Sequence, residues 1–176
     1  MRIIAGQLRG RQFKSPRSHR SHPMSEKMRG ALFNVLGDIN GLTVLDAYAG
    51  SGAVSYEAIS RGAAHATAID KSVRAYRAIK KNLEELDLTE AVKATRANVS
   101  TWSDNNDELM FDIVVCDPAY DDIRPAVLEK LVRHLKAGGI YVLRWPGSEE
   151  AEDIKGMKII KQSDYGDSKL IFFTKT

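Results

Sequence analysis

The chain has 176 residues, 43% hydrophobic and 28% charged, with a formal net charge of +3, which fits one domain with a sizeable core. No apolar run approaches the length of a membrane span and no signal-peptide core is visible, so we expect a cytoplasmic protein that makes no membrane contact. The single cysteine, Cys116, excludes an internal disulfide and a cysteine-rich metal site; because it lies in the apolar run DIVVCD, we expect it to be buried, and we expect no metal.

The first 30 residues are strongly basic, with eight Lys or Arg against one acid, so that the rest of the chain sums to −4. Residues 2–5 and 10–14 are predicted to form two short strands joined at a turn. The stretch KSPRSHRSHP that follows has no hydrophobic periodicity and is predicted to be a loop. Such a charge cluster indicates a polyanionic partner, although a solvated basic tail is the alternative. We therefore separate a basic N-terminal region, 1–24, from a main domain, 25–176.

Helix and strand patterns alternate after this region. Ser25 can cap a helix over 26–38, in which apolar residues recur at helical spacing. The stretch 157–175 reads as a hairpin that turns near Gly166. Alternation with continuous apolar strands predicts an α/β fold, with a mostly parallel sheet covered on both faces and an antiparallel C-terminal hairpin. The predicted strands are 42–47, 66–70, 92–97, 112–117 and 139–145, and the further helices are 53–61, 72–86 and 123–136.

A glycine loop follows the first core strand in the stretch LDAYAGSGAVSYEAI. Asp46 ends the strand, and Gly50 and Gly52 let the backbone pass close to a ligand before a helix begins. Asp70 ends the next strand, where a carboxylate can bind both hydroxyls of a ribose. This spacing predicts a cofactor that contains a nucleoside.

The acids around this loop favour one class of cofactor. The spacing Gly50-x-Gly52-x-x-Ser55 lacks the third glycine of a dinucleotide site, and Asp46 would repel a pyrophosphate. Both points argue against an NAD-dependent oxidoreductase. S-adenosylmethionine, which carries an ammonium and a sulfonium, would be attracted by the same carboxylate. Asn98 follows the third core strand and could meet an adenine edge, although a turn role explains it equally well.

The run VCDPAY places Asp117, Pro118 and Tyr120 at the end of a buried strand. A strand end followed by a turn is the simple explanation. However, the carboxylate of Asp117 and the carbonyl of Pro118 could also accept the two N–H groups of a nucleobase amine and aim its lone pair at a methyl group. Tyr120 could stack on a base that has left its own stack.

Two sets of motifs resemble known families. Asp-Pro-Ala-Tyr resembles the [Asn/Asp/Ser]-Pro-Pro-[Tyr/Phe/Trp] motif of amino-methyltransferases that act on nucleic acids, with Ala119 in place of the second proline. The segments RIIAGQLRGRQF, MSEKMRGALFNVL, LDAYAGSGAVSYEAISRGA and SDYGDSKL occur in the order seen in the RsmD family. Around HPMS that family more often has Arg-Pro-Thr-Thr. The resemblance covers nearly the whole chain.

The resemblance implies a Rossmann-like class I methyltransferase that uses S-adenosylmethionine to methylate N2 of a guanine in 16S ribosomal RNA, either free or within an assembled small subunit. It also assigns roles to residues. The implied cofactor residues are Asp46, Gly50, Gly52, Asp70 and Asn98, the target-base residues are Asp117, Pro118 and Tyr120, and the expected RNA contacts are Arg9, Arg11, Arg17 and Arg20. An adenine-N6 methyltransferase and a non-catalytic RNA-binding chaperone are the alternatives, and we expect a monomer.

Overall fold

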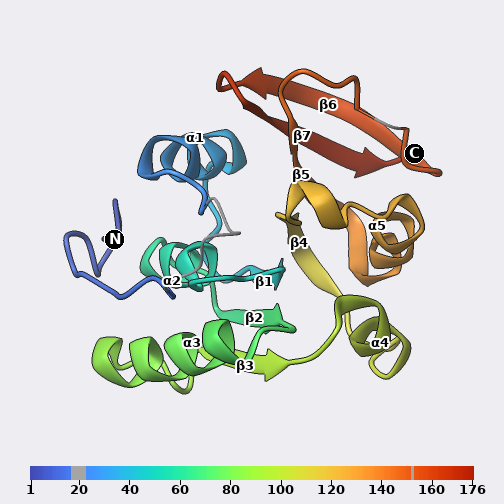
Figure 1. Ribbon diagram of the computed structural model, residues 1–176. Helices are drawn as coiled ribbons and strands as arrows, with labels where there is room; N and C mark the ends of the chain where they lie inside the picture. Colours follow the sequence, from blue (N-terminus) through green and yellow to red (C-terminus); the bar gives the residue numbers. More distant parts are fainter. Residues whose placement is uncertain (17–22, 152) are drawn as a thin grey trace.

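The structure is a computed structural model that describes residues 1–16, 23–151 and 153–176. Within these residues one sheet of seven strands has the order β3-β2-β1-β4-β5-β7-β6 (Figure 1). Strands β3 to β5 are parallel, β7 runs antiparallel to β5, and β6 runs antiparallel to β7. The predicted α/β fold is thereby confirmed. The strands span Thr43–Ala47 (β1), His65–Asp70 (β2), Val92–Arg96 (β3), Phe111–Cys116 (β4), Leu135–Pro146 (β5), Met157–Asp164 (β6) and Ser168–Lys175 (β7).

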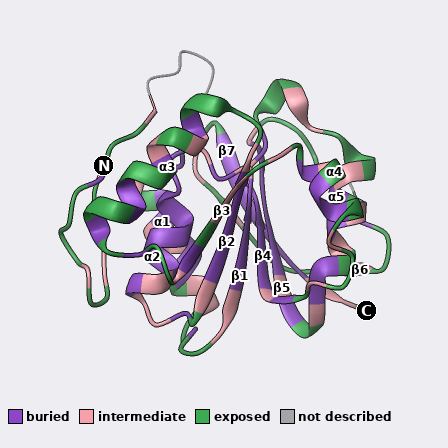
Figure 2. Cartoon of the chain, turned by 90° about the horizontal axis from the view of Figure 1, so that it is seen from below, coloured by how far each residue is buried: buried purple, intermediate pink, exposed green. Residues whose placement is uncertain are grey.

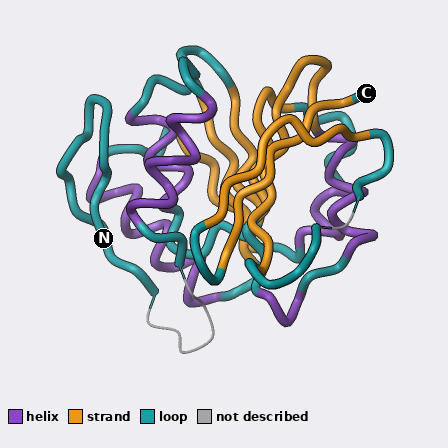
Figure 3. The backbone as a smooth tube through the Cα atoms, turned by 90° about the horizontal axis from the view of Figure 1, so that it is seen from above, coloured by secondary structure: helices purple, strands orange, loops and turns teal. Residues whose placement is uncertain are grey.

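Helices cover both faces of the sheet, which is why the central strands are mostly apolar. Helices α1 to α3 lie on one face and α4 and α5 on the other (Figures 2 and 3). Successive residues of β4 alternate between the two cores: Ile113 and Val115 pack under α1 to α3, and Val114 and Cys116 pack under α4 and α5. The helices span Glu26–Leu36 (α1), Ala53–Ser60 (α2), Val73–Leu86 (α3), Val99–Asp104 (α4) and Pro125–Leu131 (α5), with 3₁₀ turns at Tyr120–Asp122 (η1) and Val132–His134 (η2).

Several expectations about local structure are confirmed. The Ser25 side chain accepts a hydrogen bond from the amide of Met28 and caps α1. Cys116 is fully buried, and burial raises the pKa of its thiol to about 12. The C-terminal hairpin turns at Gly166, whose φ of +78° favours glycine.

Other expectations need correction. Helix α4 was not predicted, since six residues are too short for a clear periodicity. The helix predicted over 123–136 is wrong in extent: α5 has only seven residues, and β5 already begins at Leu135. The two N-terminal strands are reduced to one antiparallel bridge between Arg2 and Gln12, because the short turn-rich segment pairs with no third strand.

The N-terminal segment is nevertheless packed onto the main domain. Ile3 and Phe13 are buried in the same core as α1 to α3. The buried carboxylate of Glu57 in α2 accepts hydrogen bonds from the amides of Ile4 and Ala5, at 2.9 and 3.0 Å. The start of the chain is therefore fixed to the helix that follows the glycine loop.

Two further kinds of feature are absent from the described ranges. None of the helices there has the length and apolar character needed to cross a membrane. The same residues contain no cluster of three or more His, Cys, Asp or Glu side chains that could hold a metal ion.

Candidate active site

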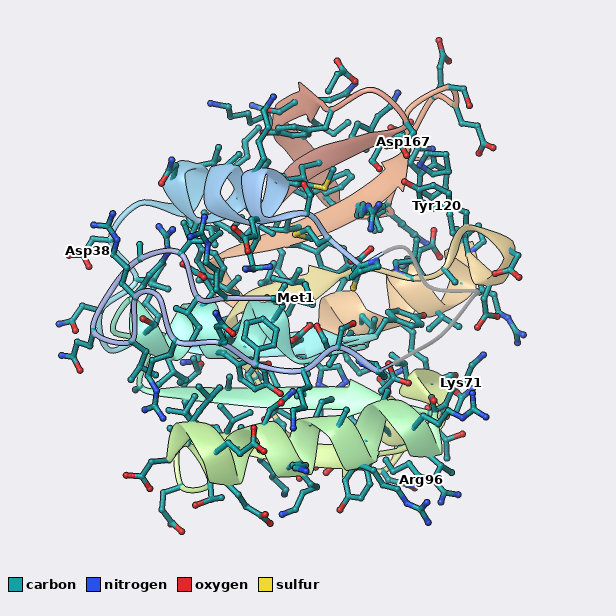
Figure 4. The ribbon with its side chains drawn as sticks, turned by 60° about the vertical axis from the view of Figure 1, so that its left-hand side comes forward. Met1, Asp38, Lys71, Arg96, Tyr120 and Asp167 are labelled. Carbon is teal, nitrogen blue, oxygen red and sulfur yellow. The ribbon has the colours of Figure 1, made fainter. Side chains whose placement is uncertain are left out.

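The carboxyl ends of β2, β1 and β4 bring three predicted acids to one rim of the sheet. Asp46 pairs with Ala68 of β2 on one side and with Val115 of β4 on the other, and Asp70 and Asp117 lie at or just beyond the ends of those flanking strands. Figure 4 shows Lys71, Tyr120 and Asp167 along this side of the molecule and Asp38 on the opposite side. The rim is thus assembled from residues that the sequence separates widely.

The loop between β1 and α2 has a strained backbone. Gly50 and Gly52 have φ of +55° and +81°, and Tyr48, which is not a glycine, has φ of +67°. A Cβ placed on Gly52 would lie 2.4 Å from the hydroxyl oxygen of Tyr56, whereas one on Gly50 would meet nothing within 4 Å. Gly52 is therefore required by the protein itself, while Gly50 leaves open space above the loop.

Asp70 ties this loop to the end of β2. One carboxylate oxygen accepts from the amide of Gly50 at 2.9 Å and the other from the amide of Ser72 at 2.8 Å. The residue is only half-buried, and each oxygen has a second lone pair. Asp70 can therefore keep the loop in place and still accept hydrogen bonds from a ligand.

Asp46 lies beneath the loop, with 1% of its surface exposed. One of its oxygens accepts from both the amide and the hydroxyl of Ser55, at 3.1 and 2.7 Å. Burial raises the pKa of Asp46 to about 7, against the lowering effect of the Ser55 hydrogen bonds, and the negative charges of Asp117 and Asp70 add to the rise. A cation bound above the loop would stabilise the ionised form.

The electrostatics of this part of the rim select the kind of ligand. Burial is the main cause of the raised pKa of Asp46, and the charges of Asp117 and Asp70 raise it further, so three carboxyl groups act on one another here. A pyrophosphate would add further negative charge here, whereas a sulfonium with an ammonium group would relieve the repulsion. The residues present therefore fit S-adenosylmethionine and do not fit a dinucleotide.

Asp117 lies on the other side of the rim, beside a buried cation. Its side chain is 18% exposed, and Oδ1 lies 3.4 Å from Nη1 of Arg144. Burial raises the pKa of Asp117 to about 6, while Arg144 acts in the opposite direction. Asp117 is therefore poised to change its charge close to neutral pH.

Tyr120 presents its ring on the same turn. The residue is 41% exposed, its hydroxyl donates to Oγ of Ser168 at 2.6 Å, and the guanidinium carbon of Arg144 lies 5.5 Å from the ring centroid. Pro118 between the two is buried, and Ala119 is exposed. The turn thus offers an acceptor and an aromatic face side by side.

Asn98 caps α4. Its side-chain oxygen accepts from the amides of Ser100 and Thr101, at 2.9 and 3.4 Å. The turn role therefore accounts for the side-chain oxygen, and a contact of this residue with an adenine stays a prediction.

The predicted RNA contacts do not gather at this rim. Arg11 donates to the carbonyls of Glu85 and Leu86 at the C-terminal end of α3, which lies at the amino ends of the strands. Arg9 is exposed on the neighbouring turn. Arg17 and Arg20 lie outside the described residues. The structure thus brings Asp46, Asp70, Asp117 and Tyr120 together and leaves Arg9 and Arg11 apart from them.

Three residues of the rim were missed by sequence reasoning. Arg144 stood in a strand that read as buried, and Ser168 stood in the SDYGDSKL motif, which was noticed without a role. Tyr48 has the sequence context of an ordinary loop residue, and no sequence pattern predicts its positive φ. Of the three, only Ser168 could have been identified from the sequence, because it belongs to the SDYGDSKL motif.

Comparisons with known proteins agree on one family. A family model described as "Conserved hypothetical protein 95" matches residues 1–174. A Bacillus subtilis protein named "Putative rRNA methyltransferase YlbH" is 28% identical over 99% of both chains. The Escherichia coli "Ribosomal RNA small subunit methyltransferase D" is 35% identical over 79% of this chain and 68% of its own.

Solved structures share the fold. "Putative methyltransferase yhhF from Escherichia coli" superposes with a TM-score of 0.87 at 24% identity, over 99% of this chain and 97% of the other. A more distant structure, described as a putative methyltransferase complexed with SAH, has a TM-score of 0.68 at 14% identity, over 84% of this chain and 48% of the other.

Proposed function

The chain belongs to the family described as "Conserved hypothetical protein 95", that of the RsmD methyltransferases, and on this premise we propose that it uses S-adenosylmethionine to methylate the N2 amine of a guanine in 16S ribosomal RNA. The observation that carries the proposal is the rim itself, where Asp117 and Tyr120 stand next to an acid-lined glycine loop. The names of the relatives support ribosomal RNA as the substrate class, and the RsmD resemblance supports guanine N2.

S-adenosylmethionine supplies, when bound, a methyl group on a positively charged sulfur. Asp70 would accept hydrogen bonds from the ribose hydroxyls, and Asp46 would offset the positive charge from below the loop. The open space above Gly50 would let the ligand approach the backbone closely.

Asp117 would act on the amine that receives the methyl group. The lone pair of a nucleobase amine is delocalised into the ring, so acceptors that hold its two N–H groups favour a pyramidal nitrogen. The carboxylate of Asp117 and the carbonyl of Pro118 lie on one turn and would serve as these two acceptors. The nitrogen gains the methyl and must lose one proton, which the Asp117 carboxylate can accept because its pKa is raised to about 6.

Tyr120 would hold the base. Its exposed ring offers a face on which a flipped guanine can stack, and stacking of this kind contributes about 1–3 kcal/mol per base. The basic region 1–24 would supply phosphate contacts that do not depend on sequence.

Transfer of a labelled methyl group from S-adenosylmethionine to RNA tests the proposal. Ribosomal RNA, assembled small subunits and duplex DNA are offered separately, and the labelled nucleosides are then identified. We expect N2-methylguanosine from ribosomal RNA, free or assembled. Label in N6-methyladenosine would favour the adenine alternative, and no label in any substrate would contradict the proposal.

A further inference from the structure

Arg144 is a charged residue in the middle of an apolar strand. It is 6% exposed and lies between the buried residues Leu143 and Trp145 of β5. Burying a guanidinium is costly unless its donors are used, so such a residue needs a specific reason to be there. Nη1 lies 3.4 Å from Oδ1 of Asp117, while Nε and Nη2 both point to Oγ of Ser168, at 3.3 and 3.1 Å.

Ser168 joins this cation to the ring of Tyr120. Its hydroxyl accepts from Arg144 and from the Tyr120 hydroxyl at 2.6 Å, and it donates to Oδ1 of Asp167 at 3.1 Å. A serine hydroxyl offers one proton and two lone pairs, so the two Arg144 N–H groups share one lone pair, the Tyr120 hydroxyl uses the other, and the proton goes to Asp167. Asp117 and Tyr120, three residues apart in one turn, are thus linked through Arg144, which contacts Asp117, and Ser168, which contacts both Arg144 and Tyr120.

The strand register builds this arrangement into the sheet. Cys116 pairs with Leu143, which brings Arg144 beside the residue that follows β4. Pro146 pairs with Ser168 on the other side of β5. The amide of Gly147 then donates to the carbonyl of Asp167 at 2.8 Å.

Gly147 also fixes the turn that carries Ser168. A Cβ at this position would lie 2.2 Å from the carbonyl oxygen of Gly166. Only a glycine permits so close an approach, so the SDYGDSKL turn sits tightly on the end of β5. The turn that carries Ser168 is therefore in direct contact with the end of β5.

We propose that Arg144 and Ser168 are positioning residues for methyl transfer, which hold the Asp117 carboxylate and the Tyr120 ring in the geometry that receives the target base. The inference rests on the proposed function of the same rim, and it gives the C-terminal hairpin a role in the reaction. Arg144 engages one oxygen of Asp117 and leaves the other for the amine. Ser168 fixes the hydroxyl of Tyr120, whose ring is otherwise exposed.

The Tyr120 contact is tested by a double-mutant cycle in single-turnover methylation. The quantity measured is the single-turnover rate constant divided by the RNA concentration at half-saturation. We expect Ser168→Ala to lower this ratio about ten-fold and Tyr120→Phe to have a similar effect. The double variant should be little worse than either single variant. Ser168→Thr, which keeps the hydroxyl, should restore most of the loss. Ser163→Ala on the neighbouring strand is the matched control and should leave the ratio unchanged.

If Ser168 only stabilised the fold, the double-mutant cycle would give a different result. If the losses multiplied in the double variant, or if Ser168→Ala changed only the unfolding temperature, the proposed link between Ser168 and Tyr120 would be wrong. S-adenosylmethionine affinity, measured by calorimetry, should stay within a few-fold of wild type in all these variants.

The Asp117 contact is tested by Arg144→Gln and Arg144→Lys. Among the residues that the structure describes, the charged or titratable groups that bear on Asp117 are Arg144 from β5, Asp46 from β1 and the adjacent thiol of Cys116. Loss of the cation should raise the pKa of Asp117 above its present value of about 6, so the acidic limb of the rate profile should move to higher pH in the glutamine variant. The lysine variant should keep the limb close to the wild-type position.

The titration of Asp117, followed by carboxyl ¹³C NMR in the free protein, separates this inference from the proposed function. Absence of methyl transfer by the wild type would contradict the proposed function and leave the titration readable. A pKa of Asp117 that is the same in wild type and Arg144→Gln would overturn the role of Arg144. A pKa raised in the glutamine variant and kept low in the lysine variant would support it.

Discussion

The two halves of the rim are held together over very different distances along the chain. On the cofactor side, Asp46 bonds to Ser55 nine residues away and Asp70 to Gly50 twenty residues away. On the acceptor side, Asp117 reaches Arg144 across 27 residues, and Tyr120 reaches Ser168 across 48. One half is a local motif, and the other exists only because β4, β5 and β7 are neighbours in the sheet.

The halves also differ in charge. The cofactor side gathers carboxyl groups, which suits a ligand that brings its own positive charge. The acceptor side contains a buried guanidinium that partly balances Asp117. We therefore expect substitutions on one side to change cofactor binding and those on the other to change transfer.

Glycine substitutions in the loop offer a strong way to break the cofactor side alone. Gly52→Ala would place a Cβ 2.4 Å from the Tyr56 hydroxyl at a φ of +81°, so overpacking and backbone strain add. We expect the unfolding free energy to fall by about 2–4 kcal/mol and S-adenosylmethionine affinity to fall more than about ten-fold. Thermal unfolding and calorimetry measure the two effects.

Gly50→Ala is the matched control for this prediction. Its φ of +55° is also left-handed, but its Cβ would meet no protein atom within 4 Å. The stability cost should be limited to about 1–2 kcal/mol, while cofactor affinity should still fall because the open space above the loop is filled. Equal losses of stability in the two variants would contradict the packing argument.

Acid should impair the acceptor side. Asp117 has its pKa raised to about 6, so kcat/KM should fall about ten-fold between pH 7 and pH 5 if the carboxylate is the active form. Unfolding cannot explain this loss through the same group: a raised pKa means that the native state takes up a proton more readily than the unfolded chain. The contribution of Asp117 to the stability of the native state is present at low pH and is lost as the pH rises through 6. Circular dichroism at pH 5 should therefore show folded protein, and a flat rate profile would remove Asp117 as the proton acceptor.

The cofactor side should respond to pH through binding. Asp46 has a pKa of about 7 in the free protein, and a bound sulfonium and ammonium would lower it. S-adenosylmethionine binding at pH 6 should therefore release a proton, and affinity should rise several-fold from pH 6 to pH 7.5. Calorimetry in buffers of different ionisation enthalpy counts the protons. Proton uptake in place of release would show that Asp46 does not sense the ligand.

The smallest effects are expected from substitutions in the basic region. Replacing Arg17 and Arg20 with Gln should lower the slope of log affinity against log salt by about one unit for every phosphate that the variant no longer neutralises. Arg11→Gln is a useful contrast because Arg11 donates to carbonyls at the end of α3, so it should lower stability more than RNA affinity. Parallel salt slopes for wild type and the Arg17, Arg20 variant would favour a merely solvated basic tail.

The contacts on the cofactor side join residues that are near in the sequence, and those on the acceptor side join distant ones. This difference explains which parts of the site could be predicted from the sequence. The strand-loop-helix around Gly50 and Gly52 and the acid at the end of β2 were predictable, because their spacing follows from local geometry. Asp117 was expected at the end of a buried strand, and the pairing of β4 with β1 brings that strand end beside the strand that carries Asp46.

The remainder of the site depended on features that periodicity does not encode. In the sequence, Arg144 is a single charged residue within an apolar strand. Its contacts with Asp117 and Ser168 depend on the pairing of β5 with both β4 and β7. Ser168 depends on the close approach of Gly147 to the hairpin turn, which no local pattern reveals. Helix α4, which carries the Asn98 cap, was missed because six residues give too few repeats.

The division of labour across the rim is tested most directly by comparing Asp70→Ala and Asp117→Ala in the same two assays. Asp70→Ala should weaken S-adenosylmethionine binding about ten-fold or more, through the loss of hydrogen bonds to a charged group, and should recover near wild-type single-turnover rates at saturating cofactor. Asp117→Ala should keep cofactor affinity within a few-fold and lose nearly all transfer. If Asp117→Ala transferred methyl groups at the wild-type rate, or if both variants lost cofactor affinity equally, the account of two separate halves would be contradicted.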